Sequence, residues 1–372
     1  KILPGILFIC LCMSALLVRA QSSDDILNVK PVPVYEMPQA EFEAQTKPFQ
    51  DKPNGDNFLS YTIRLPKDWQ QIKAEEKEGM TPMDGAASLL GEIARFYGPS
   101  LLDARSYFVL QSSDLQHDIK AKNWFMNYIL QNGYNLQFLS EISDRKVEAI
   151  YFTLEKDTAY VIRTVAEING SRMVLATYAV PESRFKEEKT TQASVLKSFR
   201  FLNPQEVQIE PSRTYSFLNL LRFDYPASWR LLAPNIYSIE AMDAKIVNSP
   251  DEAVLNGEVD IHVISTELDT TLAEEIKNVQ KSIEKKGLVI GKLIQEPHDY
   301  KFHDHIYFSR VEVYAATDAE EKLIDHEYWI CVLMEDRYFY IVTMLTPARS
   351  IDFYNWATNT EAFQTVIESL RP

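Results

Sequence analysis

The sequence reads Tyr61-Thr-Ile-Arg-Leu-Pro-Lys-Asp-Trp69 near its start and Leu221-Arg-Phe-Asp-Tyr-Pro-Ala-Ser-Trp229 past its middle, and this repeated pattern decides the fold. Each copy alternates apolar and polar residues as a half-buried strand does. A proline then ends the strand, because it lacks a backbone donor and fixes φ. A tryptophan follows three residues later, where a large ring can close the end of a hydrophobic core. We therefore interpret four residues as structural markers: Pro66, Trp69, Pro226 and Trp229.

The same order of elements follows each copy. In the first unit an amphipathic helix carries Ile119, Trp124 and Ile129 on one face and ends at Asn132-Gly133. In the second unit a helix opens with the capping box Thr271-Leu-Ala-Glu274. Each unit continues with a meander and closes with a helix, and the two helices end Ser198-Phe-Arg200 and Ser369-Leu-Arg371. The shared order and the matching ends indicate a duplicated unit.

Alternation and turn signals predict most of the strands. In the first unit we expect strands at 61–65, 106–111, 146–154, 159–168 and 172–180, and a closing helix over 190–200. Asn169-Gly170 is a two-residue hairpin signal between the last two strands. Residues 86–97 have apolar side chains at helical spacing and predict a helix, with a strand in the later part as the alternative. In the second unit we expect strands at 258–265, 288–295, 305–315, 322–334 and 337–346.

The fold class that follows is α+β. Strands joined by short turns are antiparallel, and each amphipathic helix needs a sheet to cover. We predict two tandem α/β/α-type sandwiches, each an antiparallel sheet covered by helices. The predicted boundaries are a signal peptide at 1–20, an extended proline-rich linker at 21–57, a first domain at 58–203 and a second domain at 214–372.

The first twenty residues predict export. Lys1 precedes an apolar run to Val18, and Val18 and Ala20 occupy the −3 and −1 positions of a cleavage site before Gln21. A retained membrane anchor is the alternative. After cleavage Cys331 would be the one remaining cysteine, so no intramolecular disulfide could form. A Gram-negative periplasm fits this better than a eukaryotic extracellular space, and we predict a periplasmic or secreted protein without a stable transmembrane segment.

The negative net charge of the chain disfavours some classes of binding partner. The formal charge of −15 disfavours a nucleic-acid surface and docking on anionic lipid, since both need clustered cations. Tyr338, Phe339 and Tyr340 alternate between the two faces of a predicted strand, so one face covers the core. Exposed tyrosines at a sheet edge would suit a protein partner.

The sequence contains no recognisable catalytic motif. There is no Gly-x-Ser-x-Gly motif and no glycine-rich phosphate loop, and Cys331 lies in an apolar strand that predicts a buried thiol. The metal candidates are His298, His303 and His305, because imidazoles this close can bind Zn²⁺, Cu²⁺ or Ni²⁺. Their spacing matches no known metal site, and a polar turn before a strand at Ile306 is the interpretation we prefer. We assign no catalytic residue, metal or cofactor.

Together these features resemble the Mog1/PsbP-like fold. The resemblance rests on the strand ending in Pro-x-x-Trp, the mid-domain amphipathic helix, the long meander and the closing helix ending near Ser-Phe-Arg, and it covers both units. The group includes PsbP, Mog1 and exported bacterial proteins of the DcrB type. It has no common catalytic residues. The resemblance therefore implies a binding or assembly module, often attached to a larger membrane complex.

The function predicted from these observations is that of a non-enzymatic exported binding or scaffold protein. Its expected partner is a protein of the cell envelope, with the protein acting as an accessory of a periplasmic or envelope complex. The alternative is a periplasmic protein that binds a small ligand or a metal. Such a protein would use the cleft between the domains or the segment from His298 to His305.

Overall fold

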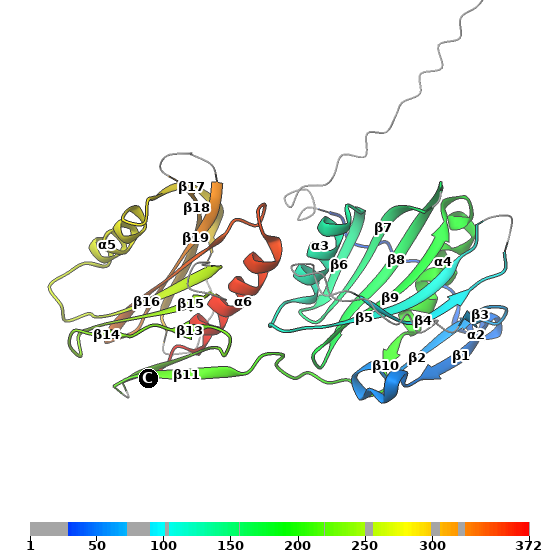
Figure 1. The fold of residues 1–372 in the computed structure, drawn as a ribbon, viewed down its shortest axis with the longest axis horizontal. Coiled ribbons are helices and arrows are strands. Elements are labelled where there is room, and N and C mark those ends of the chain that lie inside the picture. The colour runs from blue at the N-terminus through cyan, green and yellow to red at the C-terminus, as the bar shows by residue number, and fades with distance from the viewer. Residues whose placement is uncertain are drawn as a thin grey trace, which may run out of the picture.

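The computed structural model describes residues 29–72, 90–100, 104–155, 157–218, 220–249, 256–298, 306–318 and 324–371. It has two units, each with a large antiparallel sheet, a smaller sheet and helices (Figure 1). The large sheets have the same strand order, β3-β4-β5-β9-β8-β7-β6 in the first unit and β13-β15-β16-β20-β19-β18-β17 in the second. The predicted α+β class, with antiparallel sheets covered by helices, is confirmed.

The first unit has helices on both faces of its large sheet. Helix α3 packs on one face, and helix α4 covers the other together with the small sheet β1-β2-β10. Both faces are therefore apolar along the central strands β8 and β9. The elements are α2 (Gln39–Gln45), β1 (Thr46–Asp51), η1 (Pro53–Gly55), η2 (Asn57–Leu59), β2 (Tyr61–Pro66), β3 (Gln70–Ile72), β4 (Gly91–Tyr97), β5 (Tyr107–Asp114), α3 (Ala121–Asn132), β6 (Asn135–Ser143), β7 (Lys146–Glu155), β8 (Thr158–Asn169), β9 (Arg172–Pro181), α4 (Glu182–Ser198) and β10 (Arg200–Phe201).

The second unit repeats this plan. Helix α5 covers one sheet face, and helix α6 with the hairpin β11-β12 covers the other. Two covered faces explain why Phe339 and Tyr340 are both buried although they point to opposite sides. The elements are β11 (Ser212–Phe217), β12 (Leu221–Pro226), β13 (Arg230–Leu231), β14 (Asn235–Ile236), β15 (Ala241–Asn248), β16 (Gly257–Ser265), α5 (Leu272–Glu284), β17 (Leu288–His298), β18 (Phe308–Asp318), β19 (Ile324–Met334), β20 (Tyr338–Pro347) and α6 (Phe353–Ser369).

The matching sequence ends make matching contacts. The Ser198 hydroxyl accepts a hydrogen bond from the backbone N–H of Arg64 in β2, at 2.9 Å. The Ser369 hydroxyl accepts one from the backbone N–H of Asp224 in β12, at 2.7 Å. In both units a serine at the end of the closing helix thus holds the strand that leads into Pro-x-x-Trp.

The predicted linker differs from the structure. Residues 21–28 lie outside the described part of the chain, but from residue 29 onward the chain packs on the first unit. Val32 and Phe42 are buried, and β1 pairs with β2 along its whole length. Pro48 is tolerated in β1 because β1 is the edge strand of its sheet. The packed part of the first unit therefore begins before Phe58, and 29–57 is not an extended linker.

The helix predicted over 86–97 is also corrected. Residues 86–89 lie outside the described residues, and residues 91–97 form β4, which pairs with β5. Ala94 and Phe96 are buried while their neighbours are more exposed, which is the two-residue period of a strand. In the part of the chain that the structure describes, no helix is long and apolar enough to cross a bilayer.

Candidate functional site

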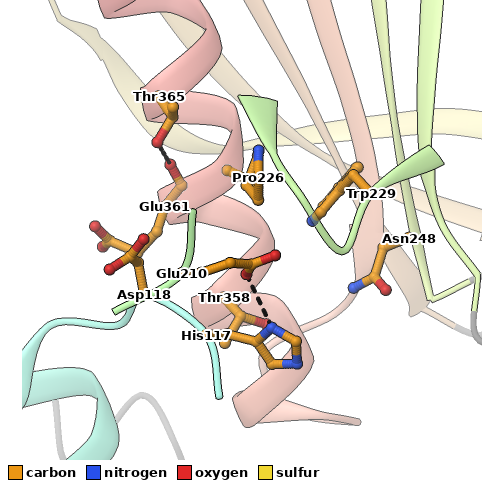
Figure 2. Close-up of a pocket in the computed structure, with 10 residues that line it drawn as sticks. His117, Asp118, Glu210, Pro226, Trp229, Asn248, Thr358, Glu361 and Thr365 are labelled. Atoms are coloured by element: carbon orange, nitrogen blue, oxygen red, sulfur yellow. Dashed lines mark hydrogen bonds and ion pairs between the residues drawn. The ribbon is translucent and has the colours of Figure 1, made fainter. Parts of the chain in front are cut away.

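The two units meet where helix α3 of the first packs against helix α6 of the second. Their apolar residues belong to one continuous core cluster that extends across the junction. Figure 2 shows the polar part of this junction, where His117 and Asp118 lie beside α6 and the turn from Pro226 to Trp229. The second copy of the repeated pattern is therefore part of the contact between the units.

The connecting segment between the units is held against the first unit. The Arg145 guanidinium donates to the carbonyl oxygens of Val207 at 3.1 Å and of Gly170 at 2.9 Å. The Asp118 carboxylate accepts from the backbone N–H of Ile209 at 2.9 Å. A segment fixed at several backbone positions has little freedom. The two units are therefore joined by a bound segment, residues 202–211 between β10 and β11, which we call the strap.

Glu210 connects both units through its two carboxylate oxygens. Oε2 lies 3.0 Å from Nδ1 of His117 in the first unit (Figure 2). Oε1 accepts from the backbone N–H of Ser228 in the second, at 2.5 Å. Burial of Glu210 opposes ionisation, but the hydrogen bonds from His117 and Ser228 outweigh it and lower the pKa of Glu210 below its usual value. The ionised carboxylate thus holds the second Pro-x-x-Trp turn in place.

Glu210 gives a testable effect on stability. We expect Glu210→Gln to lower the free energy of unfolding at pH 7 by about 1–2 kcal/mol, because charge-assisted bonds are lost. The folded pKa of Glu210 lies below the unfolded value, so its stabilisation is complete above the unfolded value and is lost as the pH falls through the folded one. Denaturant unfolding from pH 7 down to about pH 4 should show the deficit shrinking. Glu206→Gln, at an exposed position of the same segment, is the control.

The cavity that the described residues form at the junction is too small for an organic ligand. The cavity there has a volume of about 10 Å³, which is enough for roughly one water molecule. Among the described residues, no group of three or more His, Cys, Asp or Glu side chains is arranged to hold a metal ion. The junction is therefore a packed contact and differs from the ligand cleft that was one alternative.

The predicted histidine candidates are not brought together in the described residues. His298 ends β17, where its backbone pairs with Val311 of β18, and His303 and His305 lie outside the described residues. Metal binding by this segment stays a prediction.

Cys331 is buried, and burial raises the pKa of its thiol. Trp69 and Trp229 are 5% and 4% exposed. The backbone N–H of each donates to the carbonyl of the motif proline three residues earlier, Pro66 or Pro226.

A larger groove lies in the second unit, between helix α5 and strands β15 and β16. Its volume is about 270 Å³. On the sheet side, the Asp243 carboxylate accepts from the His262 ring, with Oδ1 and Nδ1 2.8 Å apart. On the helix side, Glu275, Asn278 and Ser282 line the groove. Val263, Ile264 and Val279 also line it, so the groove combines polar and apolar side chains. It is open to solvent and large enough to take a side chain of another molecule.

Three exposed apolar side chains lie on the hairpin at the mouth of this groove. Ile236, Tyr237 and Ile239 are 41%, 70% and 62% exposed, and Tyr237 also lines the groove. The hairpin is closed by the Tyr237 N–H bond to the Ala241 carbonyl. The Tyr338 hydroxyl donates to the Ile239 carbonyl and fixes the hairpin to β20. We call Ile236, Tyr237 and Ile239 the hairpin patch.

The sequence analysis predicted neither the polar contacts of the junction nor the hairpin patch. Glu210 belongs to no motif, and its role depends on how the two units are placed. The hairpin patch follows the Pro-x-x-Trp turn in a short irregular stretch that gives no periodic signal. The expected exposed tyrosines were those of the strand with Tyr338 and Tyr340, but this strand, β20, lies between β16 and β19 and Tyr340 is buried. The exposed Tyr237, next to the short edge strand β14, was not singled out.

No protein-family model matches the chain, and no curated protein matches it. Solved structures are similar to it. Cyanobacterial PsbP (CyanoP) from Synechocystis is 14% identical, with 42% of this chain and 93% of that chain covered and a TM-score of 0.31. LpqN of Mycobacterium tuberculosis, involved in cell envelope biogenesis, is 12% identical, with 45% and 98% covered and a TM-score of 0.28. The T6SS immunity protein TplEi from Pseudomonas aeruginosa is 10% identical, with 84% and 94% covered and a TM-score of 0.22.

Proposed function

We propose that this chain is a non-enzymatic binding protein of the bacterial cell envelope that contacts a protein partner through the hairpin patch and the α5 groove. The observation that carries the proposal is the hairpin patch itself: three exposed apolar side chains within four residues, beside an open groove. Aromatic and apolar side chains that remain exposed next to a pocket are typical of the centre of a protein interface.

The chemistry of this face favours a protein partner over a small molecule. A small-ligand site encloses most of its ligand in a concave pocket, whereas here the groove is open and exposed apolar side chains lie on the hairpin beside it. A partner could pack apolar residues on Tyr237 while placing a polar side chain between Asp243 and Glu275. The hairpin is held by Tyr338, so the contact surface is largely formed before binding.

The proposed location and family follow from the sequence. The apolar segment at 1–20 supports export, and the repeated Pro-x-x-Trp units support two tandem Mog1/PsbP-like domains. We infer that the first unit is a support, because its junction with the second is packed and its connecting segment is bound. The second unit would then carry the surface that the partner contacts.

A pair of tyrosine variants tests this proposal. Tyr237→Ser should reduce the amount of partner recovered from envelope extracts at least about tenfold, because a buried interface tyrosine contributes about 2 kcal/mol or more. Tyr307→Ser is the matched control, since Tyr307 is 61% exposed and precedes β18, near the other edge of the same sheet. Recovery of the same partner at equal levels with both variants would refute the proposed surface.

A further inference from the structure

We propose that the contact between the two units is a proton-dependent latch, closed while the Glu361 side chain is neutral and loosened when that side chain ionises. The proposal concerns the junction and is independent of the hairpin patch. It rests on where Glu361 lies, on the charges that surround it and on the small size of the cavity that it lines, about 10 Å³.

Glu361 lies on the face of α6 that meets the first unit. Figure 2 shows its side chain directed toward Asp118, which lies just before α3. Lys120 is the N-cap residue of α3, and its Nζ lies 3.6 Å from Oδ1 of Asp144. The backbone N–H of Ala121 donates to the Asp144 carbonyl at 2.7 Å, so the turn that carries Asp144 is fixed beside the helix start. These positions are set by backbone contacts and would not adapt easily to a new charge.

The charges around Glu361 come from every element of the junction, and most of them are negative. Helix α6 contributes Glu368, the turn between β6 and β7 contributes Asp144, and Lys120 is the cation that opposes them. The strap adds Glu210, which is already bound to His117. The titratable groups at the junction include His117, Asp118, Lys120, Glu141, Asp144, Glu206, Glu210 and Glu368. Two further cations act on these carboxylates: Arg145 interacts with Asp118 and Glu206, and Lys122 pairs with Glu141.

This environment favours the protonated carboxyl. Burial raises the pKa of Glu361 to about 7; the carboxylates Asp144, Asp118 and Glu368 act in the same direction, and Lys120 acts against them. Burial alone would lower the pKa of Lys120, but Glu361, Asp144 and Glu141 raise it, so Lys120 stays charged. One ammonium group therefore faces several carboxylates, and an ionised Glu361 would add another negative charge.

The direction of the pH effect follows from linkage. When the units separate, Glu361 returns to water and its pKa falls toward the ordinary value for glutamate. Between that value and about 7 the closed junction holds a proton that the open one releases. Proton binding therefore favours the closed form, and the advantage disappears as the pH rises through about 7. Glu210 has the opposite shift and stays ionised over this range, so the strap remains bound while the α3–α6 contact loosens.

The test is a distance measurement between the units. Spin labels are attached to cysteines at Lys197 on α4 and Lys277 on α5, both exposed, with Cys10 and Cys12 replaced by serine. Cys331 is buried and does not need to be replaced. Pulsed electron paramagnetic resonance on the full chain should give one narrow distance distribution at about pH 5.5 and a broader, longer one at about pH 8.5. The midpoint should lie near pH 7.

Three variants assign the transition to Glu361. Glu361→Gln should keep the narrow distribution at every pH. Lys120→Met should move the midpoint to higher pH, and Asp144→Asn should move it to lower pH, because they remove an opposing and a reinforcing charge. Glu284→Gln, an exposed carboxylate on α5, should behave as the unchanged protein. A distribution that does not change with pH, or a Glu361→Gln protein that still opens, would overturn the proposal.

Discussion

Replacing Glu327 with leucine is expected to lower the free energy of unfolding by about 3–5 kcal/mol, the range found when one partner of a buried ion pair is removed. Glu327 is 2% exposed and accepts hydrogen bonds from three side chains. The Arg349 guanidinium donates at 2.6 and 2.9 Å, the Trp356 indole at 2.9 Å and the Trp329 indole at 3.2 Å. Leucine would leave a largely buried guanidinium and two buried indole N–H groups without their acceptor.

The measurement is denaturant unfolding followed by circular dichroism and tryptophan fluorescence. Glu312→Leu is the matched control, because Glu312 pairs with Arg310, whose side chain is 48% exposed. That change should stay within about 1 kcal/mol, as exposed pairs usually do. Equal losses for the two variants would mean that Glu327 acts only as an ordinary strand residue. Glu327→Gln should fall between them, since the amide oxygen keeps one acceptor without the charge.

The Glu327 cluster also shows where prediction from the sequence stops. His326-Glu327 reads as part of an alternating strand, and nothing marks it as buried. Its partners Arg349 and Trp356 are 22 and 29 positions away, on a loop and a helix whose approach depends on the tertiary fold. In the first unit the corresponding region is apolar: Val161, beside Pro181 at the end of the pairing between β8 and β9, packs with Phe185 and Val32. The two units share a strand order but not this side chain.

Local signals did predict local structure. The capping box at Thr271 and Glu274 is present, the turn at Asn169-Gly170 joins β8 and β9, and Gly133 ends α3 in the left-handed conformation that glycine favours. Each of these depends on residues within one turn of chain. The packing of residues 29–57 could not be read in the same way, because a proline-rich segment has no periodicity and is fixed here by pairing with β2 and by contact with β6.

The junction was the least predictable part. The sequence could indicate two units and a short connection, but the contact of α3 with α6 depends on which of several helix faces meet. The strap is held mostly through backbone carbonyl groups, as in the bonds from Arg145 to Val207 and from Asn169 to Asn203. Backbone acceptors are identical for every residue type, so such bonds leave no pattern in the sequence.

The repeated tryptophan gives the second large expected effect. Trp69→Ala should lower the free energy of unfolding by about 3–5 kcal/mol, because removal of a buried indole leaves a cavity that the surroundings fill only in part. Trp69 is 5% exposed, and its ring packs against Tyr178 with centroids 4.8 Å apart. The space is closely matched, since a Cβ atom on Gly98 would lie only 2.9 Å from the indole nitrogen.

Two companion variants separate loss of packing from loss of a surface group. Leu154→Ala removes an apolar side chain from the same unit, but that side chain is 71% exposed, and we expect a change within about 0.5 kcal/mol. Gly98→Ala would place a methyl group against the same indole and should destabilise the protein without removing any atom. If Trp69→Ala changed the free energy of unfolding no more than Leu154→Ala does, the indole would not be closing the core. The repeated pattern would then need an explanation other than packing.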